Sequence, residues 1–307
     1  MQNALLTFSV FVAFGLVWRI AKPGGVTADA IQRPLIALIH SMLLPVYVFL
    51  VVGRMPLNAT YMRISLIVIL ATAGTLAVAW FWLGRTSLSG QTKGALLLAS
   101  AFSSAFFLGM PLTRIIVGNW SSRVAVDYML ISNILVLFTA GIYLARSFSE
   151  SNQVTRFVKD MFREPIAWGA LAGLLVNMVN IRFPGWVRGV EGMLLLGFIP
   201  LLLITVGLSI NWQQNWGQTL ADMLPVAVIQ LVVLPLFIYL VMNFIPGLGL
   251  GLKTQKVLLI EGMMPAMVWG ISICERYKLD SSSYAIAFTF TSVLACVSVP
   301  VWFNFLY

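Results

Sequence analysis

The sequence predicts an all-α integral membrane protein of ten transmembrane helices in two inverted five-helix repeats, with helices 4 and 9 crossed and broken by proline. Three observations predict this fold class. The chain is 60% hydrophobic and only 9% charged, whereas soluble domains average about 25% charged residues. Its 307 residues hold ten apolar runs, each about as long as the roughly 20 residues that span a bilayer. Prolines also recur at matched positions in the two halves.

The composition decides which partners to expect. So few charges cannot cover a water-facing surface of this size, so the lipid bilayer must surround most of the chain. The net charge is +9, which in a soluble protein would suggest nucleic acid. Here the basic residues stand singly between apolar runs, where they act as topology signals. We therefore expect no nucleic-acid partner, and no metal or other cofactor.

The order of apolar runs and connections gives the domain organisation. The runs predict helices at 4–20, 35–53, 61–83, 93–118, 124–146, 165–181, 189–210, 218–245, 255–276 and 281–306. The long polar connection between Arg146 and Glu164 separates five helices from five. We therefore expect a first five-helix repeat at 1–146, a connecting loop at 147–164, and a second repeat at 165–307.

Lysine and arginine counts predict the orientation. Connections after odd-numbered helices hold eleven of these residues and connections after even-numbered helices hold eight. If Arg114 lies inside the membrane, the second number becomes seven. The positive-inside rule then places the central loop in the cytoplasm and both termini outside.

Two proline pairs indicate the internal repeat. Pro111 and Pro265 are 154 residues apart, and Pro45 and Pro200 are 155 apart. Because five helices per half is an odd number, the second copy is inserted upside down. Inverted repeats with broken helices are typical of secondary transporters. The alternative is that proline is simply commoner in transmembrane helices than in soluble ones.

A broken helix creates a polar site inside the membrane. A mid-helix proline removes one backbone hydrogen bond, and freed carbonyl groups are tolerated only in the protein interior or facing a water-filled cavity. If helices 4 and 9 cross at Pro111 and Pro265, two half-helix N-termini meet at the midplane, where they attract anions. We therefore expect Pro111 and Pro265 to lie in a substrate site.

Two charged residues flank these prolines. Arg114 follows Pro111 by three residues, and Glu261 precedes Pro265 by four. In the proline register, Arg114 corresponds to Val268 and Glu261 to Phe107. Arg114 would hold a substrate carboxylate while Glu261 exchanges a proton for coupling or gating. Alternatively the two form a structural ion pair, or Arg114 snorkels to the interface.

Polar side chains on helices 4 and 5 are further candidates for substrate binding. Ser103 and Ser104 would donate hydrogen bonds to an oxyanion, although serine serves helix packing in membranes equally well. Asn133 lies in mid-membrane, where its amide needs partners. His40, the only histidine, is expected to be a packed side chain.

Four segments resemble the auxin efflux carrier family, which includes plant auxin exporters and bacterial permeases for malonate and malate. They are LIHSMLLPVYVF in helix 2, SAFFLGMPL in helix 4, DYMLISNILVLFTAGI in helix 5 and EGMMPAMVWGISICERYKLDSSSYAIAFTFTSVLACVSVPVW in helices 9 and 10. Where the family often has an Asn-Thr pair in helix 4, this chain has Ser104 and Ala105.

The resemblance implies ten helices with helices 4 and 9 crossed. Helices 1, 2, 6 and 7 would form a scaffold that dimerises with a second copy, and helices 3–5 and 8–10 a moving transport domain. It also implies elevator-like alternating access and an organic anion as substrate. The substrate would sit between the crossing and scaffold helices 2 and 7, near Pro45, Tyr47 and Pro200. The chain would lie in a bacterial inner membrane.

Our leading hypothesis is a proton- or potential-driven carrier of a small carboxylate. An alternative is sodium coupling of the bile-acid-symporter type, with ligands from Ser103, Asn133 and Thr139. A more remote alternative is an intramembrane enzyme, but one histidine excludes a His-rich metal site and no mid-membrane aspartates are paired. A channel is also possible, although matched broken helices favour alternating access.

Overall fold

The computed structural model describes residues 2–148, 161–181, 183–210 and 216–306. In these ranges the backbone is helical apart from connections and one isolated β-bridge. Six helices there are long and apolar enough to cross a membrane. They are Ala28–Val52, Ala59–Gly84, Ser121–Ser147, Gly189–Ser209, Asp222–Phe244 and Ser281–Asn304, and shorter apolar helices lie at Ser9–Ala21, Ala105–Val117 and Pro165–Met178. The protein is therefore an all-α integral membrane protein.

Several long helices contain a π-helical segment, labelled η. The first half contains α1 (Gln2–Ala21), α2 (Ala28–Leu38), η2 (Ile39–Leu43), α3 (Leu44–Val52), α4 (Ala59–Gly84), α5 (Gly90–Ala101), η3 (Ala105–Gly109), α6 (Met110–Val117), α7 (Ser121–Met129), η4 (Leu130–Gly141) and α8 (Ile142–Ser147). The second half contains α10 (Pro165–Met178), α11 (Val187–Ser209), α12 (Trp216–Val228), η6 (Ile229–Val233), α13 (Leu234–Phe244), α14 (Leu252–Gly262), α15 (Gly270–Arg276) and α16 (Ser281–Leu306).

Three of the π-helical segments end just before a proline. Pro45 follows η2, Pro111 follows η3, and Pro235 follows η6. Proline has no N–H, and its ring crowds the carbonyl group of the preceding turn. Widening that turn into a π-helix relieves the clash while the helix continues. These prolines therefore bend helices and do not break them.

The helical path breaks between α5 and η3 and between α14 and α15. At these breaks Ser103 pairs with Ala266 in an antiparallel bridge. The prediction that the crossing lies at Pro111 and Pro265 is therefore wrong for Pro111, which is 111 − 103 = 8 residues beyond the bridge. Pro265 is adjacent to the bridge. The error arose because a proline after a π-helical turn leaves the helix continuous.

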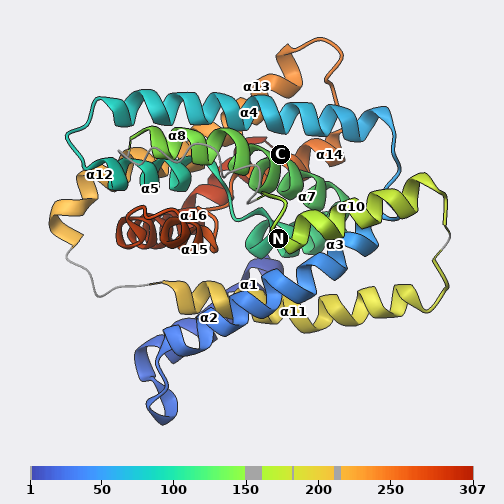
Figure 1. Ribbon diagram of the computed structural model, residues 1–307, viewed down its shortest axis with the longest axis horizontal. Coiled ribbons are helices and arrows are strands. Elements are labelled where there is room, and N and C mark those ends of the chain that lie inside the picture. The colour runs from blue at the N-terminus through green and yellow to red at the C-terminus, as the bar shows by residue number, and fades with distance from the viewer. Residues whose placement is uncertain (1, 149–160, 182, 211–215, 307) are drawn as a thin grey trace.

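The helices form two groups (Figure 1). In the flanking group, α1 packs on α11 and α3 packs on α10. Glycines allow these helices to approach closely: a Cβ on Gly207 of α11 would lie 2.0 Å from the Val12 carbonyl oxygen of α1. The crossing group comprises α4–α8 and α12–α16, with α5 buried beneath α4, α8 and α16.

The two ends of the helical bundle differ in the helix termini that they contain. The loop side is the end where Glu164, at the start of α10, contacts Arg276 at the end of α15. The far side is the opposite end, where α3 ends and α11 begins. Helices α2–α3 and α11 each connect the two sides.

Candidate functional site

The crossing is held by reciprocal backbone hydrogen bonds. The amide of Ser104 donates to the Pro265 carbonyl oxygen at 2.7 Å, and the amide of Met267 donates to the Phe102 carbonyl oxygen at 2.9 Å. Two extended segments thus satisfy each other's backbone hydrogen-bonding groups in the membrane interior. There, an unpaired backbone group costs several kcal/mol. The amides of Ser104 and Met267 point into the protein and do not face an open anion site.

Side chains from neighbouring helices satisfy further backbone groups at the crossing. Asn133 Nδ2 of η4 donates to the Ser103 carbonyl oxygen at 3.0 Å, and Gln230 Nε2 of η6 donates to the Met264 carbonyl oxygen at 2.9 Å. The Ala266 amide donates to Thr291 Oγ1 of α16 at 3.3 Å. The crossing is therefore tied to three other helices of its group.

Both candidate serines lie at the crossing and are buried. Ser103 Oγ donates to the Tyr128 hydroxyl at 3.2 Å. Ser104 is 1% exposed, and its hydroxyl has no hydrogen-bond partner in the described structure. It stands at the N-terminus of η3, where the first amides of a helix have no partner within it. The Ser104 hydroxyl is thus a buried polar group at the crossing without a hydrogen-bond partner among the described residues.

Glu261 is fully buried on α14, one turn before the crossing. Its Oε1 accepts a hydrogen bond from Thr113 Oγ1 at 3.2 Å, while Oε2 has no partner among the described residues. A Cβ on Gly109 would lie 2.0 Å from Oε2, so that glycine makes room for the carboxyl group. Glu261 is thus an isolated carboxyl group between the half-helices.

The far-side cavity contains the predicted arginine. It measures about 340 Å³ and lies between the end of α3, the start of α11, and the α6–α7 connection. Arg114 is half-buried and donates to Ser122 Oγ at 2.6 Å and to Asn119 Oδ1 at 2.9 Å. Both partners are neutral, and neither is Glu261. The Tyr47 hydroxyl of the flanking group lies near Arg114 and Ser122.

The far-side cavity also contains one ion pair and a second arginine. Arg54 at the end of α3 donates to Glu191 of α11 at 2.7 Å, and Arg123 of α7 also lines the cavity. Three arginines and one glutamate give the lining an excess of positive charge. Arg114 and the exposed Arg123 both line this space without a carboxylate among their hydrogen-bond partners in the described structure, and Arg114 is the more buried of the two.

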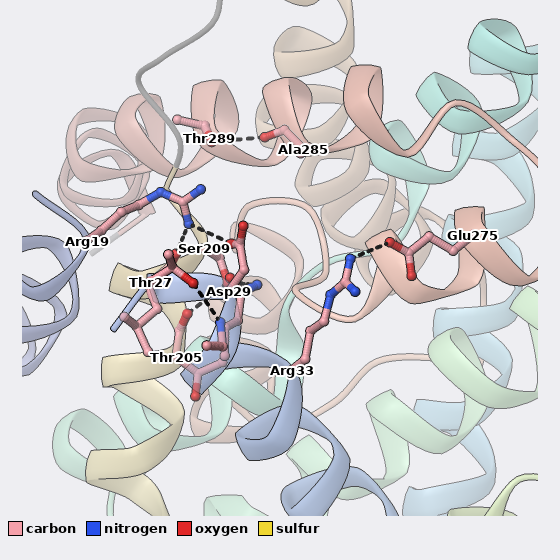
Figure 2. Close-up of polar contacts among 12 residues, drawn as sticks. Arg19, Thr27, Asp29, Arg33, Thr205, Ser209, Glu275, Ala285 and Thr289 are labelled. Carbon is pink, nitrogen blue, oxygen red and sulfur yellow. Dashed lines mark hydrogen bonds and ion pairs between the residues drawn. The ribbon is translucent and has the colours of Figure 1, made fainter. Parts of the chain in front are cut away.

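A second polar cavity lies on the loop side (Figure 2). It measures about 450 Å³ and lies between α2, the end of α11, α15 and α16. Arg19 lies 3.5 Å from Asp29, and Arg33 lies 3.5 Å from Glu275. The lining also includes Gln32, His40, Ser209, Trp269, Ser272 and Arg276.

A buried ionic cluster forms one wall of the loop-side cavity. Glu164 is 1% exposed and accepts hydrogen bonds from His40 Nε2 at 2.7 Å and from Arg276. Burial alone would raise the pKa of Glu164, but the hydrogen bonds and charges of His40 and Arg276 outweigh it and hold the pKa below 4.5. The His40 ring also lies 4.6 Å from that of Trp269. His40 is thus packed, as predicted, but it also belongs to an ionic cluster.

The structure brings some predicted site residues together and separates others. Ser103, Ser104, Asn133 and Pro265 meet at the crossing, and Arg114 and Tyr47 meet at the far-side cavity. Three prolines lie elsewhere. Pro111 lies within η3–α6, Pro45 packs against Gly169 of α10, and Pro200 lies within the continuous helix α11.

Sequence reasoning missed the loop-side cavity. Arg19, Arg33 and Arg276 had been interpreted as topology signals, because each stands at the end of an apolar run. A signal was available in the polar first turns of α2, where Asp29, Gln32 and Arg33 recur at helical spacing. Those residues caused the predicted start of this helix to be placed at 35, whereas α2 begins at Ala28.

A comparison with protein families identifies the chain. The model of a family described as "Membrane transport protein" matches residues 5–303. The chain belongs to the auxin efflux carrier family. This confirms the resemblance seen in the sequence. Members of this family are transporters, so the protein is a transporter and not an enzyme.

One curated relative is similar over almost its whole length. An uncharacterized transporter of Methanothermobacter thermautotrophicus is 25% identical over 304 residues, which cover 98% of this chain and 96% of the relative. The match therefore includes both halves of the chain, the crossing and both cavities. It supports the assignment to a family of membrane transporters.

Proposed function

We propose that this member of the auxin efflux carrier family is a secondary active transporter of a small carboxylate, driven by protons or by the membrane potential. The observation that carries the proposal is Arg114, which presents its charge to the far-side cavity with only neutral hydrogen-bond partners in the described structure. A guanidinium group binds a carboxylate through two parallel hydrogen bonds. Arg114 would therefore receive the anion, and Tyr47 would contact it from the flanking group.

An organic anion suits the crossing better than an inorganic one. A third cavity of about 480 Å³ touches Pro265 and is lined mainly by apolar side chains of α1, η3, α11 and α16. Apolar walls with a few polar groups are typical of sites for small organic molecules. The carbon skeleton of the substrate would contact these walls, while Ser104 and Asn133 offer polar contacts at the crossing.

The architecture that we propose is ten transmembrane helices in two inverted repeats, at 1–146 and 165–307. The matched packing of α1 on α11 and of α3 on α10 supports it, because these pairs exchange under such a repeat. The flanking group would be the scaffold, with a homodimer formed through it. The crossing group would be the transport domain, which moves against the scaffold in elevator-like alternating access.

We place the protein in a bacterial inner membrane with both termini periplasmic and the loop side cytoplasmic. The eleven lysines and arginines in connections after odd-numbered helices support this orientation. Glu261 would couple transport to protons. Its carboxyl group is fully buried without a cationic partner in the described structure, and intramembrane carboxyl groups of this kind typically mark proton pathways.

Counterflow in proteoliposomes tests the proposal. Liposomes loaded with unlabelled malonate should accumulate radiolabelled malonate transiently, with saturable kinetics, which separates a carrier from a channel. Arg114→Ala should reduce the initial rate at least tenfold. Arg63→Ala is the matched control, because Arg63 is exposed at the start of α4, outside both cavities. Normal counterflow by Arg114→Ala would contradict the assigned role of Arg114.

Sodium coupling is a second candidate, favoured by unpaired oxygens around the crossing. Asn133 Oδ1, Gln230 Oε1 and Glu261 Oε2 are buried and have no hydrogen-bond partner in the described structure. Amide and carboxylate oxygens suit a hard cation. The Thr139 hydroxyl donates to the Leu135 carbonyl oxygen of its own helix at 2.6 Å and keeps its oxygen lone pairs for a ligand. Transport that requires sodium and does not change with a pH gradient would support this alternative.

A further inference from the structure

The crossing defines which residues of the two halves correspond. Ser103 faces Ala266, and the two backbone hydrogen bonds exchange residues 102–104 with residues 265–267. In this register, a residue of the first half corresponds to the residue 266 − 103 = 163 positions later in the second half. The proline pairs had indicated 154. The crossing is the better guide, because it is where the two halves contact each other reciprocally.

In the crossing register the second half also has its arginine. Arg114 follows Ser103 by 11 residues on α6, and Arg276 follows Ala266 by 10 residues on α15. Each lies on the half-helix that leaves the crossing, one towards the far side and the other towards the loop side. The predicted correspondence of Arg114 with Val268 is therefore wrong. Arg276 is its counterpart to within one residue.

The two polar cavities correspond in the same way. The far-side cavity lies against the end of α3 and the start of α11, and the loop-side cavity against the start of α2 and the end of α11. From Asp29 to Arg54 the α2–α3 helix rises roughly 35 Å, so the cavities lie at opposite ends. Each is closed by a half-helix that carries an arginine, and by the start of the following helix at Ser122 or Ala285.

We propose that the loop-side cavity is a second binding site for the transported carboxylate, with Arg276 in the role of Arg114. This inference rests on the proposed function. The transport domain would then present one arginine to each side of the membrane. A substrate from the cytoplasm would bind at Arg276, and a substrate from outside would bind at Arg114.

The lining of the loop-side cavity is suited to an arriving carboxylate. Three arginines and two carboxylates face it. The Arg19–Asp29 and Arg33–Glu275 pairs are long, at 3.5 Å, and in each pair at least one side chain is well exposed, so they are worth little and are easily rearranged. Gln32 and Ser209 supply neutral polar groups.

Arg276 can serve the cavity while it contacts Glu164. Its side chain is 48% exposed and lines the cavity, and it contacts Glu164 through one terminal nitrogen, Nη1. A guanidinium group has five N–H donors, so one arginine can contact two carboxylates. Arg276 would then link the bound substrate to Glu164, which belongs to the flanking group.

Transport from each face separates the two arginines. Right-side-out and inside-out membrane vesicles from cells that express the protein would be supplied with radiolabelled malonate. In inside-out vesicles, Arg276→Gln should raise the half-saturating malonate concentration about tenfold. In right-side-out vesicles its value should stay within about twofold of wild type. Arg114→Gln should show the reverse pattern.

Three further variants complete the test. Arg85→Gln is the matched control, because Arg85 is exposed at the end of α4, stacks on Phe81 and lies outside both cavities. If Arg276→Gln fails to fold, the double variant Glu164→Gln/Arg276→Gln replaces it, since it leaves no buried carboxylate without its partner. Arg276→Lys should restore part of the affinity by restoring the charge.

The outcomes distinguish this inference from the proposed function. Unchanged transport by Arg276→Gln from both faces, with wild-type protein active, would overturn the second site and leave the carrier intact. Equal effects of Arg276→Gln on both faces would also overturn it, because they indicate damage to the fold. Absence of saturable transport of malonate and other small carboxylates by the wild-type protein would instead reject the proposed function.

Discussion

Glu164 connects three segments that are distant in the sequence. It stands at the start of α10 and contacts His40 of η2, 124 residues away, and Arg276 of α15, 112 residues away. A carboxylate that is 1% exposed is expensive to bury alone. Its two basic partners offset that cost, so the cluster is stable only when all three segments are in place.

Loss of this carboxylate should destabilise the protein. Glu164→Ala leaves His40 and Arg276 without their shared partner, and losing a hydrogen bond to a charged group costs about 1.5–3 kcal/mol. We expect a clear decrease in the melting temperature of the purified protein in detergent. Glu275→Ala, which removes an exposed partner of Arg33, should change it little. Equal melting temperatures for Glu164→Ala and wild type would contradict the importance of the cluster.

The stability from Glu164 should depend on pH with a defined sign. Its pKa is lower in the folded protein than its ordinary value of 4.5. The contribution is therefore fully present above pH 4.5 and is lost as the pH falls through the lower folded value. Melting temperatures measured from pH 6 down to about pH 3 should fall less steeply for Glu164→Gln than for wild type. Parallel curves would contradict this.

Glu261 allows coupling to be tested separately from binding. Under the proposed function, Glu261→Gln should abolish malonate accumulation driven by a pH gradient. Exchange of labelled for unlabelled malonate without a gradient should persist, because an amide keeps the shape of the carboxyl group and its contact with Thr113. Asp222→Asn, outside both polar cavities, serves as the control. Gradient-driven accumulation at the wild-type rate in Glu261→Gln would rule out this role.

Single residues show how far the sequence predicts the site. Arg114 and Asn133 were predicted because charge and amide groups are rare inside apolar runs, and Ser103 and Ser104 because their hydroxyl groups can donate hydrogen bonds to an oxyanion. The loop-side residues were not, because Arg276 looks the same as an arginine that only marks a helix end. Its contact with Glu164 depends on a separation of 112 residues, which no local pattern encodes.

At the scale of elements, apolar runs predicted the helices well where their ends are polar. The prediction 61–83 compares with Ala59–Gly84 for α4, and 281–306 with Ser281–Leu306 for α16. The break in helix 4 was placed wrongly. Phe102 is extended without a proline or glycine beside it, and it is the partner segment around Ala266 that holds it so. Such a break is a tertiary effect.

The contact between α1 and α11 provides a test of element packing. A Cβ on Gly207 would lie 2.0 Å from the Val12 carbonyl oxygen and 3.0 Å from the Gly15 Cα. These are backbone atoms, so the helices must separate. Gly207→Ala should therefore lower stability by about 1–3 kcal/mol, measured as a lower melting temperature. Gly197→Ala on the same helix has nothing within 4 Å of its new Cβ and should stay near wild type.

At the scale of the whole molecule, the proposed elevator motion requires the flanking and crossing groups to separate on the loop side. Arg33 of α2 and Glu275 of α15 contact each other across that boundary at 3.5 Å. Arg33→Cys/Glu275→Cys, joined through disulfide bonds by a bifunctional methanethiosulfonate reagent in a background with Cys274 and Cys296 replaced by serine, should stop transport. Reduction should restore it.

A cross-link within one group provides the control. Trp80 of α4 and Ser147 of α8 contact each other at 3.4 Å, and both belong to the crossing group. Trp80→Cys/Ser147→Cys, joined by the same reagent, should leave transport intact. If the link between Arg33 and Glu275 formed completely and transport continued, the two groups would not move apart there.

The sealed crossing has a consequence for the electrical behaviour of the membrane. Carbonyl groups of Ser103 and Met264 and amides of Ser104 and Met267 all have protein partners, so they need no water at the level where the two segments cross. Without a continuous column of water across the midplane, hydrated ions have no pore through which to diffuse. The protein should therefore show no channel openings in planar bilayers, and any current across them should depend on transport of the substrate.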